Sequence, residues 1–112
     1  MDDLKKVLRA FAKERDWDQY HSPKNLAMAL VVEAGEIVEH FQWLTEEQSK
    51  NPPPEKLAKI RAEIGDTLIY LVRLSDRLGI DPVQAARDKV RQNAEKYPVE
   101  KAKGTAKKYN EL

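Results

Sequence analysis

Two stretches of the sequence each place a pair of acidic residues, three positions apart, inside a strongly helical pattern. The first, LVVEAGEIVEHF, contains Glu33 and Glu36, and the second, IRAEIGDTLIYL, contains Glu63 and Asp66. Side chains three positions apart are neighbours on one face of a helix, with Cβ atoms roughly 5–6 Å apart. Each predicted helix therefore presents two carboxylates side by side, and the rest of the chain has to pack around them.

The connection between the two helices, residues 45–54, is short and polar, which predicts an antiparallel helix pair. In such a pair, residues equally far from the connection lie at the same height. Glu36 and Glu63 are matched in this way, and so are Glu33 and Asp66. The sequence therefore predicts four carboxylates at one level between two helices.

Four carboxylates at one level require a cation, because like charges at short range raise each other's pKa and burial raises it further. Oxygen ligands suit Mg²⁺, or alternatively Mn²⁺, with open positions for water and substrate phosphates. Apolar residues flank both acidic pairs, and no Lys or Arg lies within four positions of Glu33 or Glu36. This pattern favours a metal site over two solvated helix faces, which remain the alternative.

The length of 112 residues predicts one domain, residues 1–112. The sequence contains no cysteine, so thiol nucleophiles are excluded. The absence of cysteine excludes disulfides and zinc–thiolate sites. A net charge of +1 gives no indication of a nucleic acid polymer or an anionic membrane as partner. No apolar run reaches the ~20 residues of a membrane span, and the N-terminus lacks the pattern of a secretory signal. We therefore expect a soluble, cytoplasmic protein.

Apolar residues recur at helical spacing in four stretches and no strand pattern is present. The fold class is therefore all-α, a bundle of four main helices. The predicted helices cover residues 2–15, 23–44, 55–77 and 82–97, and the lysine-rich stretch from about 99 to 112 is predicted to be a flexible tail. Long helices in so short a chain predict an oligomer that covers their second faces.

Gly35 and Gly65 occupy matched positions inside the two acidic pairs. Glycine inside a helix costs roughly 1 kcal/mol relative to alanine, so two such residues need a structural reason. We expect either a close approach of the two helices or room for a ligand at this level.

Several side chains could complete a binding site around the carboxylates. Loops with exposed aromatic residues are candidates for binding flat ligands, and Trp17 lies in such a stretch. Trp43, two turns after the first acidic pair, could close a base pocket with Trp17. Tyr70 follows the second pair by one turn and could stack on a ligand or form a hydrogen bond with it. Lys89 and Asn93 share one face of the last helix and could contact phosphates. Packing explains Trp17 and Tyr70 equally well. Spacing alone favours packing for Trp43 and a solvated face for Lys89 and Asn93.

A di-iron bundle would carry a Glu-x-x-His motif in each of two helices. Here His40 follows Glu36 by four positions, and the later helix contains no histidine. The spacing therefore favours Mg²⁺ over iron. A Ser-His-Asp triad and a Gly-rich phosphate loop are also absent from the sequence.

The paired motif, with 26 residues between Glu36 and Glu63, resembles that of the MazG-like all-α nucleoside triphosphate pyrophosphohydrolases. With RDW, FQW, DTLIYL and the terminal KYP and KKYNEL around it, the chain most resembles the dCTP pyrophosphatase branch over nearly its whole length. The resemblance implies a MazG-like fold and hydrolysis of a nucleoside triphosphate to monophosphate and pyrophosphate. The leading substrate is dCTP or a 5-modified dCTP, and the implied role is removal of aberrant nucleotides.

The resemblance also implies roles for individual residues. The Mg²⁺ ligands and catalytic residues would be Glu33, Glu36, Glu63 and Asp66. The base and sugar pocket would be formed by Trp17 with the loop through His21, and by Trp43 and Tyr70. The phosphate or sugar contacts would come from Lys89 and Asn93. Family members form dimers or tetramers with sites near subunit interfaces, which implies a homo-oligomer whose pocket includes residues of another chain.

One residue departs from the pattern of this branch. Relatives can carry a histidine near the base in the first helix, where this chain has Leu8. The same chemistry on dUTP, or on a broad or aberrant set of nucleoside triphosphates, is therefore the first alternative. A non-catalytic helical interaction module is the second, and a redox-active metal bundle is the third.

Overall fold

The computed structural model describes residues 1–111, in which there are helices and no β-strand. The chain divides into two compact units, one from Met1 to Ile80 and one that begins at Asp81. The first contains α1 (Asp2–Glu14), the 3-10 helix η1 (Asp18–Tyr20), α2 (Pro23–Phe41), α3 (Glu46–Lys50) and α4 (Pro54–Arg77). The second contains α5 (Pro82–Lys96), α6 (Val99–Ala102) and the 3-10 helix η2 (Tyr109–Glu111). The all-α prediction is confirmed, while a single domain and one bundle of four helices stay predictions.

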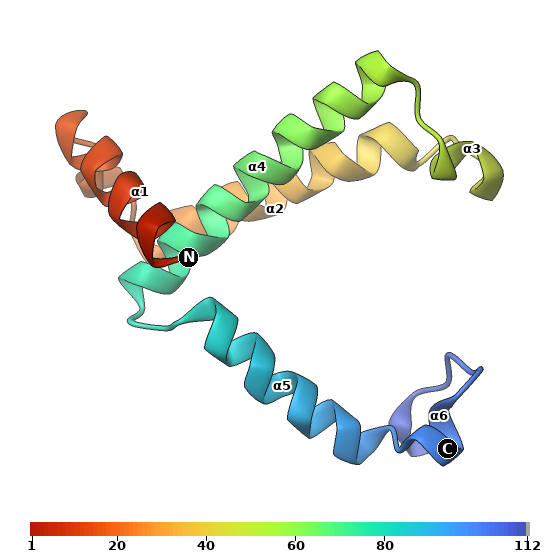
Figure 1. Cartoon of the computed structure of the whole chain (residues 1–112). Helices are drawn as coiled ribbons and strands as arrows, with labels where there is room; N and C mark the ends of the chain where they lie inside the picture. The colour runs from red at the N-terminus through yellow and green to blue at the C-terminus, as the bar shows by residue number, and fades with distance from the viewer. Residues whose placement is uncertain (112) are drawn as a thin grey trace. The chain divides into compact units, whose positions relative to one another are not determined.

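The first unit is built on the antiparallel pair of α2 and α4, which lie side by side in Figure 1. Leu26 of α2 and Ile60 and Val72 of α4 are buried. Helix α1 contacts α4 and buries Leu8 and Ala12. The short connection between α2 and α4 therefore joins an antiparallel helix pair, as the sequence predicts.

Polar caps set where the helices begin. Ser22 Oγ accepts a hydrogen bond from the Asn25 amide at 3.2 Å, and Asp81 Oδ1 accepts two at the start of α5, both at 3.0 Å. Thr45 and Gln48 form the reciprocal hydrogen bonds of a capping box. Because Thr45 starts the separate helix α3, α2 ends at Phe41, and the predicted continuation of this helix to residue 44 is wrong.

Much of the predicted apolar stripe of α4 is exposed in a single chain. The exposed fractions are 53 % for Leu57, 54 % for Ile64, 37 % for Leu68 and 40 % for Leu71. Helix α2 likewise exposes Met28, Val31, Val32 and Val38. We call these eight residues the exposed apolar set. Across residues 1–111, no helix combines the length and the apolar character needed to cross a membrane.

The two glycines between the acidic residues do not mark a close approach within this chain. A Cβ atom built on Gly35 or Gly65 would meet nothing within 4 Å. Both positions are open because each glycine is exposed on its own helix. The expected close contact of the helices at these positions is wrong, whereas the expected room for a ligand is compatible with the open space.

An ion pair joins α1 to the end of α4. Arg9 Nε and Nη2 donate to the two carboxylate oxygens of Asp76 at 2.6 and 2.5 Å. The Asp76 side chain is only 8 % exposed. Its pKa is lowered, first by the Arg9 hydrogen bonds and further by the positive charges of Arg9, Lys5 and Arg73.

Asp76→Asn should lower the free energy of unfolding at pH 7 by about 1–3 kcal/mol, because it removes the buried carboxylate of a charged hydrogen bond to the half-exposed Arg9. A carboxylate with a lowered folded-state pKa stabilises the fold above its unfolded pKa, and this contribution is lost as the pH falls through the folded value. Urea unfolding should therefore show a gap between variant and wild type that closes as the pH falls from about 5 to about 2.5.

A suitable control for that experiment is Asp88→Asn, which removes an exposed ion pair with Arg91. This change should cost less than about 0.5 kcal/mol. A gap for Asp76→Asn that stays constant over the whole pH range would contradict the proposed role of the ionised carboxylate.

Candidate active site

The predicted carboxylates lie on α2, with Glu33 and Glu36, and on α4, with Glu63 and Asp66. Glu33 is partly buried, and its pKa is raised first by burial and next by the neighbouring Glu36 carboxylate. The negative charges of Asp66 and Glu63 raise it further, with Asp66 having the larger effect. Glu33 thus lies within electrostatic range of the other three carboxylates, as the matched positions on the two helices predict.

Two of these carboxylates have a buried oxygen that lacks a hydrogen-bond donor, Glu33 Oε2 and Glu63 Oε2. Burial of a charged oxygen without a partner is costly, so the donor set fits a cation. In the present conformation, no group of three or more His, Asp or Glu side chains among residues 1–111 is arranged to hold a metal ion. Ligation would therefore require side-chain rotation within this cluster.

His40 lies next to this cluster, although the sequence analysis considered it only as a possible iron ligand. Its Nε2 atom lies 3.2 Å from Glu63 Oε2, across the gap between α2 and α4. The two atoms lack the alignment of a hydrogen bond, so the oxygen still has no donor. His40 is one turn from Glu36 on α2, and this spacing is the sequence signal that could have placed it beside the site.

A second feature of the first unit is a mostly apolar pocket of about 60 Å³. Its walls come from α1, α4 and the loop between α1 and α2, and they consist of Leu8, Phe11, Ala12, Trp17, His21, Ile69, Tyr70 and Arg73. The Trp17 ring lies edge-on to Phe11, with centroids 5.6 Å apart, and 6.2 Å from the His21 ring. The pocket therefore joins three of the predicted binding residues, Trp17, His21 and Tyr70.

The other predicted binding residues do not line this pocket. Trp43 follows the end of α2 and is 85 % exposed. Helix α2 begins beside His21, so its 19 residues separate Trp43 from the pocket by roughly 28 Å within one chain. Lys89 and Asn93 lie on α5 in the second unit, and their part in the site stays a prediction.

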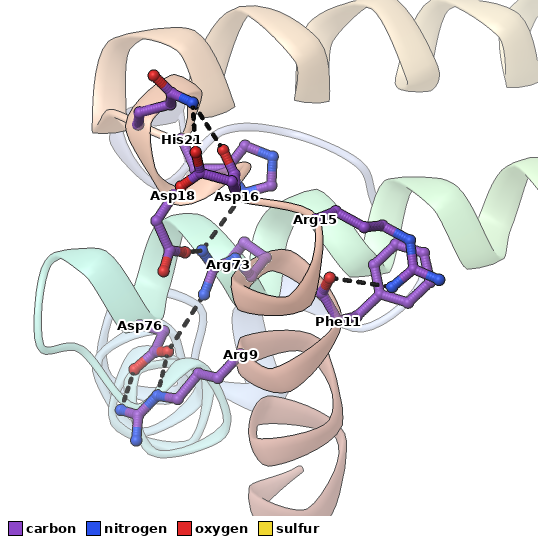
Figure 2. Close-up of polar contacts among 9 residues, drawn as sticks. Arg9, Phe11, Arg15, Asp16, Asp18, His21, Arg73 and Asp76 are labelled. Carbon is purple, nitrogen blue, oxygen red and sulfur yellow. Dashed lines mark hydrogen bonds and ion pairs between the residues drawn. The ribbon is translucent and has the colours of Figure 1, made fainter.

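Arg73 connects the pocket to a network of charged residues that the sequence argument missed. It is 3 % exposed, and its Nη2 atom donates to Asp18 Oδ1 at 2.9 Å. The same nitrogen lies 3.3 Å from His21 Nδ1, and Nη1 lies 3.8 Å from Asp76. Figure 2 shows Arg73 between Asp18 and Asp76. A single basic residue inside the apolar run LIYLVRL was the available sequence signal.

This network also borders an open cleft of about 390 Å³. The cleft is lined by Arg9, Lys13, Asp18, Arg73, Asp76 and Arg77. The two acidic residues are paired, Asp76 with Arg9 and Asp18 with Arg73. These pairs hold α1 and the following loop against α4, and the loop carries Trp17 and His21.

One face of α4 carries both the acidic cluster and part of the pocket. Glu63, Asp66, Tyr70 and Arg73 are separated by three, four and three positions. This spacing places them on a single side of the helix. A ligand bound along this face would meet carboxylates at one end and the apolar pocket at the other.

Known proteins show the same combination of sequence and fold. Residues 28–112 match the MazG-like family. The chain is 43 % identical to dCTP pyrophosphatase 1 of Mus musculus and 40 % identical to that of Homo sapiens, in each case over all of this chain and 67 % of the relative. A pyrophosphatase from Archaeoglobus fulgidus DSM 4304, known from its crystal structure, matches with a TM-score of 0.83 at 37 % identity, over 88 % of this chain and 92 % of the other. This chain therefore belongs to the MazG-like family.

Proposed function

We propose that the chain is a metal-dependent nucleoside triphosphate pyrophosphohydrolase, with dCTP or a 5-modified dCTP as the leading substrate. The observation that carries the proposal is the single face of α4. At one end it bears Asp66 and Glu63, whose buried Oε2 has no donor among the described residues, and at the other end it forms part of an aromatic pocket. The names of the relatives, dCTP pyrophosphatase 1 and pyrophosphatase, support this reaction. Water adds across the bond between the α- and β-phosphates, and the products are a deoxynucleoside monophosphate and pyrophosphate.

In the proposed enzyme, Glu33, Glu36, Glu63 and Asp66 hold Mg²⁺, with Mn²⁺ as a substitute. When bound there, the cation would supply neutralisation of phosphate charge and a lowered pKa for a water molecule. The carboxylates of the chain select a hard cation through their oxygen atoms. They also keep the triphosphate out of the site unless that cation is present, because the like charges repel each other.

The base lies in the pocket between α1, α4 and the loop that carries Trp17. Trp17 and Tyr70 offer aromatic surfaces for stacking, and Leu8 and Ile69 form apolar walls. The small volume favours a single-ring base. Lys89 and Asn93 of α5 supply contacts to the phosphates or sugar, and Trp43 reaches a pocket only in another copy of the chain.

The exposed apolar set supports assembly into a homodimer or homotetramer. A chain of 12.9 kDa that exposes so many apolar side chains on two adjacent helices has surface to bury in an interface. Light scattering coupled to size-exclusion chromatography should report a mass at least twice that of the chain. A monomer at micromolar concentration would contradict the assembly without bearing on the chemistry.

A nucleotide panel with Mg²⁺ tests the proposed reaction. Monophosphate plus pyrophosphate, fastest from dCTP or its 5-substituted forms, is the expected result. The same products fastest from dUTP, or from many nucleotides at similar rates, would keep the reaction and change the substrate. Absence of hydrolysis of every nucleotide by the folded, metal-supplied protein would favour a non-catalytic interaction module instead.

A further inference from the structure

His40 of α2 and Glu63 of α4 bring two polar atoms together across the gap between the two helices. His40 Nε2 lies 3.2 Å from Glu63 Oε2. The histidine side chain is 18 % exposed and the glutamate side chain is 22 % exposed, so both are mostly withdrawn from water. The contact therefore places an imidazole nitrogen beside a carboxylate of the acidic cluster.

The two atoms are close, yet neither is committed to a hydrogen bond. Glu63 Oε2 is buried and has no hydrogen-bond partner among residues 1–111. Within the same range, the contact with Glu63 is the one polar contact of the His40 side chain. A buried carboxylate oxygen without a partner is costly, and a group that binds both atoms would remove this cost.

A metal ion is a group of this kind. Divalent ions such as Mg²⁺ and Zn²⁺ bind oxygen or imidazole nitrogen at roughly 2.0–2.2 Å. Two neighbouring ligands at right angles on an octahedral ion are then about 3 Å apart. The 3.2 Å between His40 Nε2 and Glu63 Oε2 is close to this spacing. The pair thus already has the separation of two adjacent ligands of one ion.

Further ligands have to come from the other carboxylates. In the present conformation, no third His, Asp or Glu among residues 1–111 joins the pair in an arrangement that could hold a metal ion. Glu33 Oε2 is the other carboxylate oxygen that is buried without a partner in this range. Side-chain rotation of Glu33 toward the pair would satisfy both oxygens with one cation.

An orienting role for His40 would leave a different geometry. A histidine that only positions a metal-binding carboxylate donates a ring N–H to one of its oxygens. In the structure, Glu63 Oε2 lacks that hydrogen bond although the ring nitrogen is within reach. The observed contact therefore favours direct ligation over positioning.

An imidazole ligand changes which metal ion a site prefers. Carboxylates and water suit Mg²⁺ and Mn²⁺, whereas imidazole suits ions such as Fe²⁺, Ni²⁺ and Zn²⁺. For a site with nitrogen and oxygen ligands, the affinity also rises from Mn²⁺ to Co²⁺. One nitrogen ligand therefore shifts the preference toward transition-metal ions. Mg²⁺ can still bind, because it readily keeps water in place of a protein ligand.

We propose that His40 Nε2 is a ligand of the cation held by the acidic cluster, and that this nitrogen shifts the preference of the site from Mg²⁺ toward transition-metal ions. The inference rests on the cation site of the proposed function, but not on the reaction. Metal binding can be measured on protein without nucleotide. His40 is thus a specificity-determining residue for the metal ion.

Isothermal titration calorimetry with Co²⁺ and with Mg²⁺ gives the first test. His40→Leu should lower the affinity for Co²⁺ by about 10-fold or more. Its affinity for Mg²⁺ should stay within about 3-fold of wild type, since water replaces the imidazole around Mg²⁺. His40→Gln keeps an amide donor for Glu63 but has no imidazole, so it should lose Co²⁺ affinity as well. Equal losses for the two ions, or wild-type Co²⁺ affinity in His40→Gln, would overturn the proposal.

Electron spin echo spectra of the Mn²⁺-loaded protein test the ligand directly. The sequence contains two histidines, His21 and His40, so a coupling between Mn²⁺ and an imidazole ¹⁴N has two possible sources. The coupling should be present in wild type and absent from His40→Leu. The matched control is His21→Leu, which should retain it. A wild-type spectrum without this coupling would refute ligation by His40, and so would a coupling that persists in His40→Leu.

The same titrations separate this inference from the proposed function. If Glu63→Gln, shown to be folded by circular dichroism, binds both ions as wild type does, the cation site of the proposed function fails and the inference fails with it. If Glu63→Gln loses both ions while His40→Leu retains both, the inference alone fails. A protein that shows the His40 coupling but hydrolyses no nucleotide would support the inference and overturn the reaction.

Discussion

Glu63→Gln should lower the rate of pyrophosphate release from dCTP by about 1,000-fold or more while leaving the helical content unchanged. Glu63 Oε2 is buried without a hydrogen-bond donor and lies in the carboxylate cluster. Glutamine has nearly the same shape but carries no charge, so it weakens metal binding without creating a cavity. Loss of several kcal/mol of charge stabilisation corresponds to roughly this change in rate.

The matched control is Glu39→Gln, which makes the same chemical change at an exposed position of α2. Its rate should stay within about 2-fold of wild type, as expected for a surface substitution remote from the site. Far-UV circular dichroism establishes whether both variants are folded. A Glu63→Gln variant that turns over dCTP at the wild-type rate would show that Glu63 is not a ligand of the catalytic metal.

Removal of divalent cations with excess chelator should abolish turnover. Four carboxylates repel a triphosphate, and a bound cation relieves this repulsion. Activity should return when Mg²⁺ is added above the chelator concentration. Substantial pyrophosphate release in the chelated protein would contradict a metal-dependent mechanism.

Chelation should also change the thermal stability of the protein, and the raised pKa of Glu33 predicts how this change depends on pH. The folded-state pKa of Glu33 is raised above 4.5, so its contribution to stability is present below the unfolded pKa and is lost as the pH rises through the folded value. A bound cation offsets this loss. The difference in Tm between metal-loaded and chelated protein should therefore increase as the pH rises from about 4.5 to about 8. A difference that shrinks with rising pH would contradict the assignment of Glu33 to the cation site.

Local sequence patterns predicted the elements of this fold and the position of the acidic cluster. The caps at Ser22, Thr45 and Asp81 depend only on neighbouring residues, and each forms in the structure. The prediction that the two acidic pairs lie at the same height followed from helical spacing and a short connection. Together these restrict the two helices to an antiparallel pair in one register. Helix α2 ends three residues before its predicted end, and residues 42–44 form a turn ahead of the cap at Thr45.

Contacts between distant parts of the sequence were harder to predict. His21 and Arg73 are 52 positions apart, and their pairing depends on how α1 and the following loop rest on α4. The open space around Gly65 likewise depends on side-chain packing rather than on spacing. Leu57, Ile64, Leu68 and Leu71 of α4 follow helical spacing yet are exposed in the single chain, and no pattern within one chain indicates that exposure.

The α4 face that bears Glu63, Asp66, Tyr70 and Arg73 also fixes the distance between its carboxylates and its pocket residues. Asp66 and Arg73 are seven positions apart, which is about 10 Å along a helix with a rise of 1.5 Å per residue. The α4 residues at the cation end and at the base end of the proposed site therefore belong to one helix, whose geometry sets their separation. A nucleotide analogue whose sugar is replaced by a much longer or shorter linker would fit only one end at a time. The proposed site would thus select substrates by their span as well as by their base.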